Sequence, residues 1–90
     1  MFSRDKLIIK FLENPQSFRF KKIKKVLIHL KFRQSRISGS HHLYVHTDLK
    51  DFLTIPIHKN DCKPIYKFKI AKFIKDNFPD YGTIQTHNNR

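Results

Sequence analysis

One turn of the chain gathers residue types that can carry out chemistry. Gly39-Ser40-His41 stands at the entrance to a stretch of alternating residues. A glycine lets the backbone approach a ligand closely, a serine offers its hydroxyl and a nearby N–H to an anion, and a histidine, with an ordinary pKa of about 6.5, exchanges a proton near neutral pH. RNA cleavage needs such groups, because a base takes the 2′-OH proton, the oxygen attacks the adjacent phosphorus, and cations stabilise the developing charge. The alternative is an ordinary hairpin turn followed by a half-buried strand histidine.

A second histidine could join this site. His58 follows Pro56-Ile57 at the end of the next alternating stretch. In an antiparallel meander that end can lie near the start of the preceding strand, so His58 could approach His41. An exposed loop histidine that takes no part in chemistry is the alternative.

The chain has six histidines, and three of them stand close together, which raises the question of a metal site. His41 and His42 are neighbours, so on a strand they point to opposite faces. His42 and His46 share a side but are too far apart on an extended strand to hold one ion, and no cysteine or carboxylate supports them. We therefore predict neither a metal nor a cofactor.

The charge is concentrated in two blocks. The 90 residues carry a formal net charge of +12, with eight basic residues and no acidic one within residues 15–40 and a net charge of +4 within residues 63–78. Such a charge destabilises a compact state by self-repulsion, so we expect a polyanionic or acidic partner. Nucleic acid is the first candidate, an anionic membrane surface the second and an acidic protein the third.

Hydrophobic periodicity predicts three helices and three strands. Pro15 ends the first helix, Ser17 is the expected N-cap of the second, and Pro64 suits the first turn of the third. Pro56 cannot donate a ladder hydrogen bond, so its strand ends there or lies at an edge. The predicted helices span residues 5–13, 18–30 and 64–77, and the predicted strands span residues 32–37, 41–47 and 52–57.

This order predicts an α+β two-layer domain, in which helices pack on one face of a three-stranded antiparallel sheet. The other face of the sheet would stay solvated and available. We divide the chain into an N-terminal helical extension (residues 1–14), the main domain (residues 15–79) and a flexible tail (residues 80–90).

Several other classes of protein do not fit the sequence. No apolar stretch is long enough to span a membrane, and no secretory signal pattern is present. Cys62 is the single cysteine, so no internal disulfide can form. We expect a protein of the reducing cytoplasm, without a membrane partner.

Four segments follow one another in the middle of the chain. They are a basic polar segment, a Gly-Ser-His-His turn, a hydrophobic strand and an Ile-Pro-x-His strand end: Arg33-Gln34-Ser35-Arg36, Gly39-Ser40-His41-His42, Leu43-Tyr44-Val45-His46 and Ile55-Pro56-Ile57-His58. On these segments, the chain resembles the HicA toxin family over residues 20–78. Where that family usually has glycine, after the first core helix and after the second histidine motif, this chain has Lys31 and Lys59. The helix preceding Pro15 resembles that of a longer subgroup of the family.

The resemblance implies a double-stranded-RNA-binding-like fold, a toxin endoribonuclease that cleaves messenger RNA, and a HicB-like antitoxin that covers the active site. The essential histidine of the family maps to His41, with Ser40 and His58 as candidates to assist it. The basic blocks gain a role as phosphate contacts. The residues predicted to contact RNA are Lys21, Lys22, Lys25, Arg33, Arg36, Gly39, Lys69 and Lys72.

Three other functions remain as alternatives. A non-catalytic RNA-binding module of the same fold would keep its RNA affinity after His41→Ala. A protein-interaction domain would bind RNA weakly and one acidic protein tightly. A DNA-binding helix-turn-helix is disfavoured, because three strands follow the two helices and the lysine face lacks residues that read bases.

Overall fold

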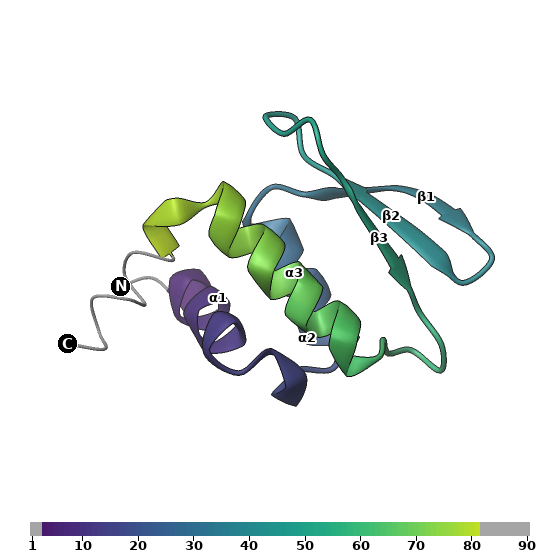
Figure 1. The fold of residues 1–90 in the computed structure, drawn as a ribbon, viewed down its shortest axis with the longest axis horizontal. Helices are drawn as coiled ribbons and strands as arrows, with labels where there is room; N and C mark the ends of the chain where they lie inside the picture. Colours follow the sequence, from purple (N-terminus) through teal and green to yellow (C-terminus); the bar gives the residue numbers. More distant parts are fainter. Residues whose placement is uncertain (1–2, 82–90) are drawn as a thin grey trace.

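The computed structural model describes residues 3–81, and its elements follow the predicted order (Figure 1). A short helical turn at residues 79–81 follows the last helix. Among the helices of this part of the chain, none is long and apolar enough to cross a membrane. The elements are α1 (Ser3–Glu13), the 3-10 turn η1 (Pro15–Ser17), α2 (Phe20–His29), β1 (Arg33–Ser38), β2 (His41–Val45), β3 (Leu53–Pro56) and α3 (Pro64–Asn77).

The start of α2 differs from the prediction. Ser17 is not its N-cap, because its hydroxyl donates to the carbonyl oxygen of Asn14 at 2.8 Å and closes the 3-10 turn. The N-cap is Arg19, and the Phe20 N–H donates to a carboxylate oxygen of Asp61 at 2.9 Å. A distant side chain therefore satisfies the helix end that a local residue was expected to cap.

The end of α2 is a tight left-handed turn. The N–H of Phe32 donates to the carbonyl of Leu27 at 2.9 Å, and that of Lys31 donates to Ile28 at 3.0 Å. This pair of bonds is a Schellman motif, in which the residue at Lys31 usually is glycine. Lys31 adopts a φ of 75°, so the chain makes the glycine-type turn with a lysine.

The sheet is antiparallel, with strand order β1-β2-β3. Gly39 and Ser40 form a two-residue hairpin turn between β1 and β2, and Gly39 has a φ of 60°. This positive φ at the first turn residue is the type II′ pattern, which matches the twist of a hairpin. The register shifts between Gln34 and Arg36, so Ser35 is an extra residue in β1. Pro56 ends β3 at the sheet edge, as predicted.

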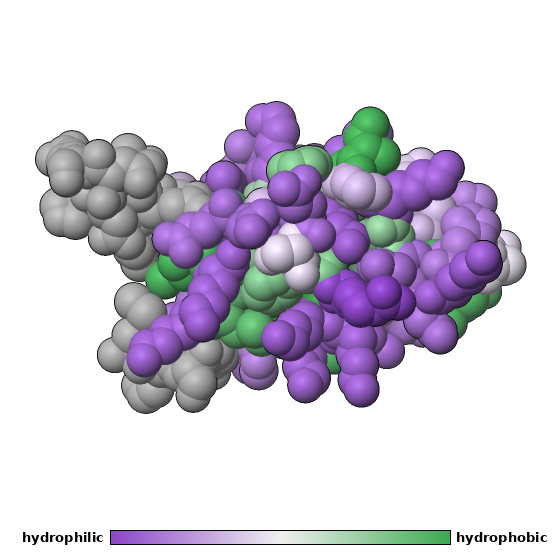
Figure 2. All heavy atoms as spheres, turned by 90° about the horizontal axis from the view of Figure 1, so that it is seen from below, coloured by the Kyte–Doolittle hydropathy of each residue, from purple (hydrophilic) through white to green (hydrophobic). Residues whose placement is uncertain are grey.

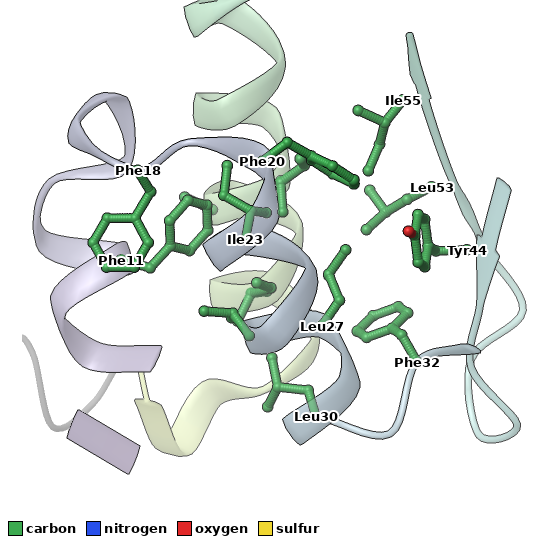
Figure 3. Close-up of a cluster of buried hydrophobic side chains, with 14 of the residues drawn as sticks. Phe11, Phe18, Phe20, Ile23, Leu27, Leu30, Phe32, Tyr44, Leu53 and Ile55 are labelled. Carbon is green, nitrogen blue, oxygen red and sulfur yellow. The ribbon is translucent and has the colours of Figure 1, made fainter. Parts of the chain in front are cut away.

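The helices cover one face of the sheet, and the core lies between the two layers. In Figure 3, Tyr44, Leu53 and Ile55 point from the strands toward α2. Tyr44 is fully buried, and its hydroxyl donates to the amide oxygen of Gln34 at 3.2 Å. The predicted apolar face of α2 is confirmed, since each of its members is buried: Phe20, Ile23, Val26, Leu27 and Leu30.

The N-terminal helix packs on the same core. Ile8, Phe11 and Leu12 of α1 belong to the buried cluster, and the rings of Phe11 and Phe18 lie 5.4 Å apart. The Tyr81 hydroxyl donates to Asp5 at 2.9 Å and joins the end of the described chain to this helix. Of the tail predicted for residues 80–90, residues 82–90 lie outside the described part of the chain.

Candidate active site on the open face of the sheet

One face of the sheet is turned away from the helices, and we call it the open face. Residues that pair directly across an antiparallel sheet share a face, and neighbours along a strand alternate. Tyr44 pairs with Gln34 and Leu53 on the helix side, so the intervening positions of β2 lie on the open face. The open face comprises Arg33, Arg36 and Ser38 of β1, His41, Leu43 and Val45 of β2, and Thr54 and Pro56 of β3.

His41 lies at the end of this face nearest the Gly39–Ser40 turn. Its side chain is exposed, and it pairs with Ser38 on one side and Pro56 on the other. A substrate can therefore reach the imidazole from solvent without displacing any part of the core. At Gly39, an added Cβ would have no heavy atom within 4 Å beyond its chain neighbours, so the turn itself borders open space.

The turn that carries His58 is joined to the turn before His41. The N–H of Ile57 donates to the carbonyl oxygen of Ser40 at 2.7 Å. Pro56, the last residue of β3, pairs with His41, and His58 begins the next turn two residues further along the chain. His58 is exposed. The topology thus gathers His41, Ser40 and His58 at one end of the sheet.

Asp61 fastens the His58 turn to the helices. His58 and Asp61 exchange backbone hydrogen bonds of 2.8 and 3.0 Å around Lys59 and Asn60, which both have positive φ, 53° and 64°. The Asp61 carboxylate accepts the N–H of Phe20 and of its neighbour Cys62, each at 2.9 Å. Partial burial raises the pKa of this carboxyl, but these N–H donors and the nearby lysine outweigh it and lower the pKa below its usual value.

The lysine that pairs with Asp61 is Lys67, which sequence reasoning assigned no role. Its ammonium lies 3.3 Å from the carboxylate, and the residue is 6% exposed. Arg19 adds a longer ion pair of 3.8 Å. The sequence pattern does indicate that Lys67 is buried. With Ile70, Ala71 and Ile74, position 67 completes an apolar stripe at i, i+3, i+4 and i+7. A lysine at such a position calls for an acidic partner.

The predicted RNA-binding residues divide between two surfaces. Arg33, Arg36 and Gly39 lie on the open face or at its turn. The lysines lie on the solvent side of the helices that cover the opposite face of the sheet: Lys21, Lys22 and Lys25 on α2, and Lys69 and Lys72 on α3. On the face seen in Figure 2, hydrophilic side chains cover most of the surface.

Two of the remaining histidines face the helices. The His42 ring packs edge-on against Phe20, with centroids 6.2 Å apart, and its buried Nδ1 has no hydrogen-bond partner within residues 3–81. His46 lies 2.9 Å from the carbonyl oxygen of Leu30 through Nε2 and accepts the Asp48 N–H through Nδ1 at 3.1 Å. No group of three or more His, Cys, Asp or Glu side chains in the described chain could hold a metal ion.

Comparison with known proteins identifies a family. The model of the family described as HicA toxin of bacterial toxin-antitoxin matches residues 20–76, from the start of α2 almost to the end of α3. Neither the curated proteins nor the solved structures gave a match. The matched segment includes the whole sheet and both turns of the candidate site, whereas α1 and η1 precede it.

Proposed function

Because the chain belongs to the HicA toxin family, we propose that it is the toxin of a toxin–antitoxin pair and acts in the cytoplasm by cleaving messenger RNA. The catalytic residue in this proposal is His41. The observation that carries it is the position of His41, an exposed histidine beside a tight Gly-Ser turn on a face that bears two arginines and, among its eight residues, no acid.

The chemistry follows from the groups at this end of the sheet. His41 takes the proton from a ribose 2′-OH, and the oxygen attacks the adjacent phosphorus. The bond from phosphorus to the 5′-oxygen breaks, which leaves a 2′,3′-cyclic phosphate on one fragment. The departing 5′-oxygen must receive a proton, and His58 is the candidate donor because the hydrogen bond from the Ile57 N–H to Ser40 joins its turn to the turn before His41.

The negative charge that develops on the phosphate needs cations and N–H groups near His41. Arg36 lies on the open face, diagonal to His41, because it pairs with Leu43, two residues along β2. A diagonal pair of positions in a sheet is within reach of a long side chain. Ser40 offers its hydroxyl at the turn. The nucleophile is part of the RNA itself, so these groups suffice for the step.

The first experiment compares RNA cleavage by the wild type and by His41→Ala in the presence of EDTA, with RNA binding measured for both. His29→Ala is the matched control, because His29 is exposed on α2, away from the open face. We expect the wild type and the control to cleave, and His41→Ala to bind without cleaving. His58→Ala is expected to slow cleavage and leave binding unchanged.

Two other outcomes would change the assignment. Equal cleavage by the wild type and His41→Ala means that His41 is not the catalytic residue. Binding without cleavage by either protein favours the non-catalytic RNA-binding module. In cells, expression of the wild type is expected to arrest growth, and His41→Ala is not. We further propose that a HicB-like antitoxin binds over the open face, so co-expression of that protein restores growth.

A further inference from the structure

The open face has an ordered layout that goes beyond the catalytic end. Each row across the sheet contributes one side chain from each strand. The row of His41 contains Ser38 and Pro56, and the next row contains Arg36, Leu43 and Thr54. Cations therefore line the β1 side, whereas apolar side chains run along the middle strand.

An exposed aromatic ring completes this layout at the far end. Phe52 directly precedes Leu53, the first residue of β3, whose partner is Tyr44. Extended by one position, this register sets Phe52 opposite Val45, which pairs with Arg33 on its other side. Leu53 is buried against the helices, whereas Phe52 is 59% exposed and is not part of the core. The alternation of β3, extended by this one residue, puts the ring on the side opposite to that of Leu53, which is the open side.

More than half of the surface of this residue is in contact with water, although its side chain is apolar. Nucleobases stack on such rings in proteins that bind single-stranded RNA, and arginines beside them hold the phosphates. From this arrangement we infer a nucleobase-binding subsite at Phe52, which stacks one base of a single-stranded RNA whose backbone runs along β2 past Arg33 and Arg36 to His41. This inference rests on the proposed ribonuclease function.

The subsite fixes the distance between the stacked base and the bond that is cut. His41 and Val45 are four positions apart on β2, which corresponds to about 13 Å at the usual rise of a strand. A few nucleotides fill this length. Asp48, Lys50 and Asp51 follow in the loop beyond, which therefore has no net positive charge to attract further phosphates. The part of the open face that binds RNA is therefore short and ends at Phe52.

The geometry also selects the form of the RNA. A base can stack on Phe52 only if it is unpaired and turned toward the protein, which a duplex does not allow. The substrate is thus a single-stranded segment of messenger RNA, although the fold resembles one that binds duplexes by shape. Helical RNA would meet the lysines of α2 and α3 but would leave Phe52 uncovered.

The test measures binding to a short, unstructured RNA whose 2′-oxygens are methylated, so that no cleavage can occur. Phe52→Ala is expected to weaken this binding about 5- to 150-fold, the range found when a stacking aromatic is truncated. Phe52→Tyr should restore it. Phe68→Ala is the matched control, because Phe68 is 49% exposed on α3, away from the open face, and should bind as the wild type does.

A second probe separates stacking from general affinity. An oligonucleotide with the same backbone but abasic positions keeps its phosphates, so Phe52→Ala and the wild type should bind it equally. Thermal melting of each variant checks that the fold is intact. Equal binding of the methylated RNA by Phe52→Ala and the wild type overturns the subsite, and so does an equal loss with the abasic strand. Failure of the wild type to cut RNA refutes only the proposed function, because these measurements need no cleavage.

Discussion

The ion pair between Asp61 and Lys67 allows a quantitative test, because it joins the His58 turn to α3. Lys67 has a side chain that is 7% exposed, and that of Asp61 is 24% exposed. Asp61→Asn keeps an oxygen that can accept the N–H groups of Phe20 and Cys62 but removes the charge opposite the ammonium. Removing one partner of a buried pair costs about 3–5 kcal/mol, and partial exposure of Asp61 reduces this to roughly 2–3 kcal/mol.

The cost should appear in urea unfolding and in thermal melting. For a domain of this size, about 2–3 kcal/mol lowers Tm by roughly 8–24 °C. Lys67→Met removes the ammonium and keeps an apolar stem of similar length, so we expect a loss below about 1 kcal/mol. The double variant should resemble Lys67→Met alone, so the coupling energy should equal the cost of Asp61→Asn, about 2–3 kcal/mol.

An exposed ion pair on the same helix provides the control. Lys72 and Asp76 lie 3.1 Å apart, with side chains 78% and 58% exposed. Asp76→Asn should change the free energy of unfolding by less than about 0.5 kcal/mol. If Asp61→Asn costs no more than Asp76→Asn, or if its effect adds to that of Lys67→Met, the pair does not stabilise the turn as argued.

The pH dependence has a defined sign. The folded protein lowers the pKa of Asp61, so its contribution is complete above the unfolded value near 4 and is lost as the pH falls through the folded value. The difference in stability between the wild type and Asp61→Asn should therefore be constant around neutral pH and shrink in acid below about pH 4. A difference that grows in acid would contradict the assignment.

Three further expectations follow from single positions. His46→Ala should destabilise the fold by about 2 kcal/mol in urea unfolding, because it removes two hydrogen bonds and the contacts with Phe32 and Phe78, whereas His29→Ala should change little. Cys62 is 7% exposed, and burial raises the pKa of its thiol to about 11. It should therefore react with a thiol reagent far more slowly in the native protein than in urea, and equal rates would contradict its burial. Lys59→Gly should raise the free energy of unfolding by about 0.5 kcal/mol, because glycine accepts a φ of 53° without strain. Lys63→Gly is the control in the same urea unfolding measurement and should not stabilise the fold, because the φ of Lys63 is −67°.

Local pattern predicted most of the fold. The alternation of residues 41–46 separated His41 from His42, and the structure confirms that His42 and Tyr44 face the helices while His41 does not. The periodicity of α2 predicted its buried face, and Pro56 marked the end of an edge strand. These features depend on neighbours along the chain, which the sequence shows directly.

Features that depend on distant residues were missed. Ser17 was expected to cap α2. Instead, the N–H of Phe20 donates to Asp61, which is 41 residues away in the sequence. The burial of Lys67 was also missed, although Asp61 is only six residues away and the spacing with Ile70, Ala71 and Ile74 indicated a buried position. The division of the basic residues between two surfaces also depends on packing, since charge along the chain does not tell which face of a sheet the helices cover.

This division gives the two sets of cations different roles in the proposed reaction. RNA bound along β2 can contact Arg36, whereas Lys21 and Lys25 lie on α2, in the helical layer behind the sheet. The Debye length is about 8 Å at physiological ionic strength and about 30 Å at 0.01 M. The lysines can therefore attract RNA at low salt, whereas at physiological salt their field is screened before it reaches the open face.

The double variant Lys21→Gln/Lys25→Gln should accordingly slow RNA association at low salt and leave cleavage at physiological salt nearly unchanged. Arg36→Gln should weaken binding at both salt concentrations, because a direct phosphate contact is lost in each. If the lysine variant loses as much cleavage at physiological salt as Arg36→Gln does, the RNA must lie across the helices. In that case the protein would recognise duplex RNA by its shape, and single-stranded RNA would not bind along the open face.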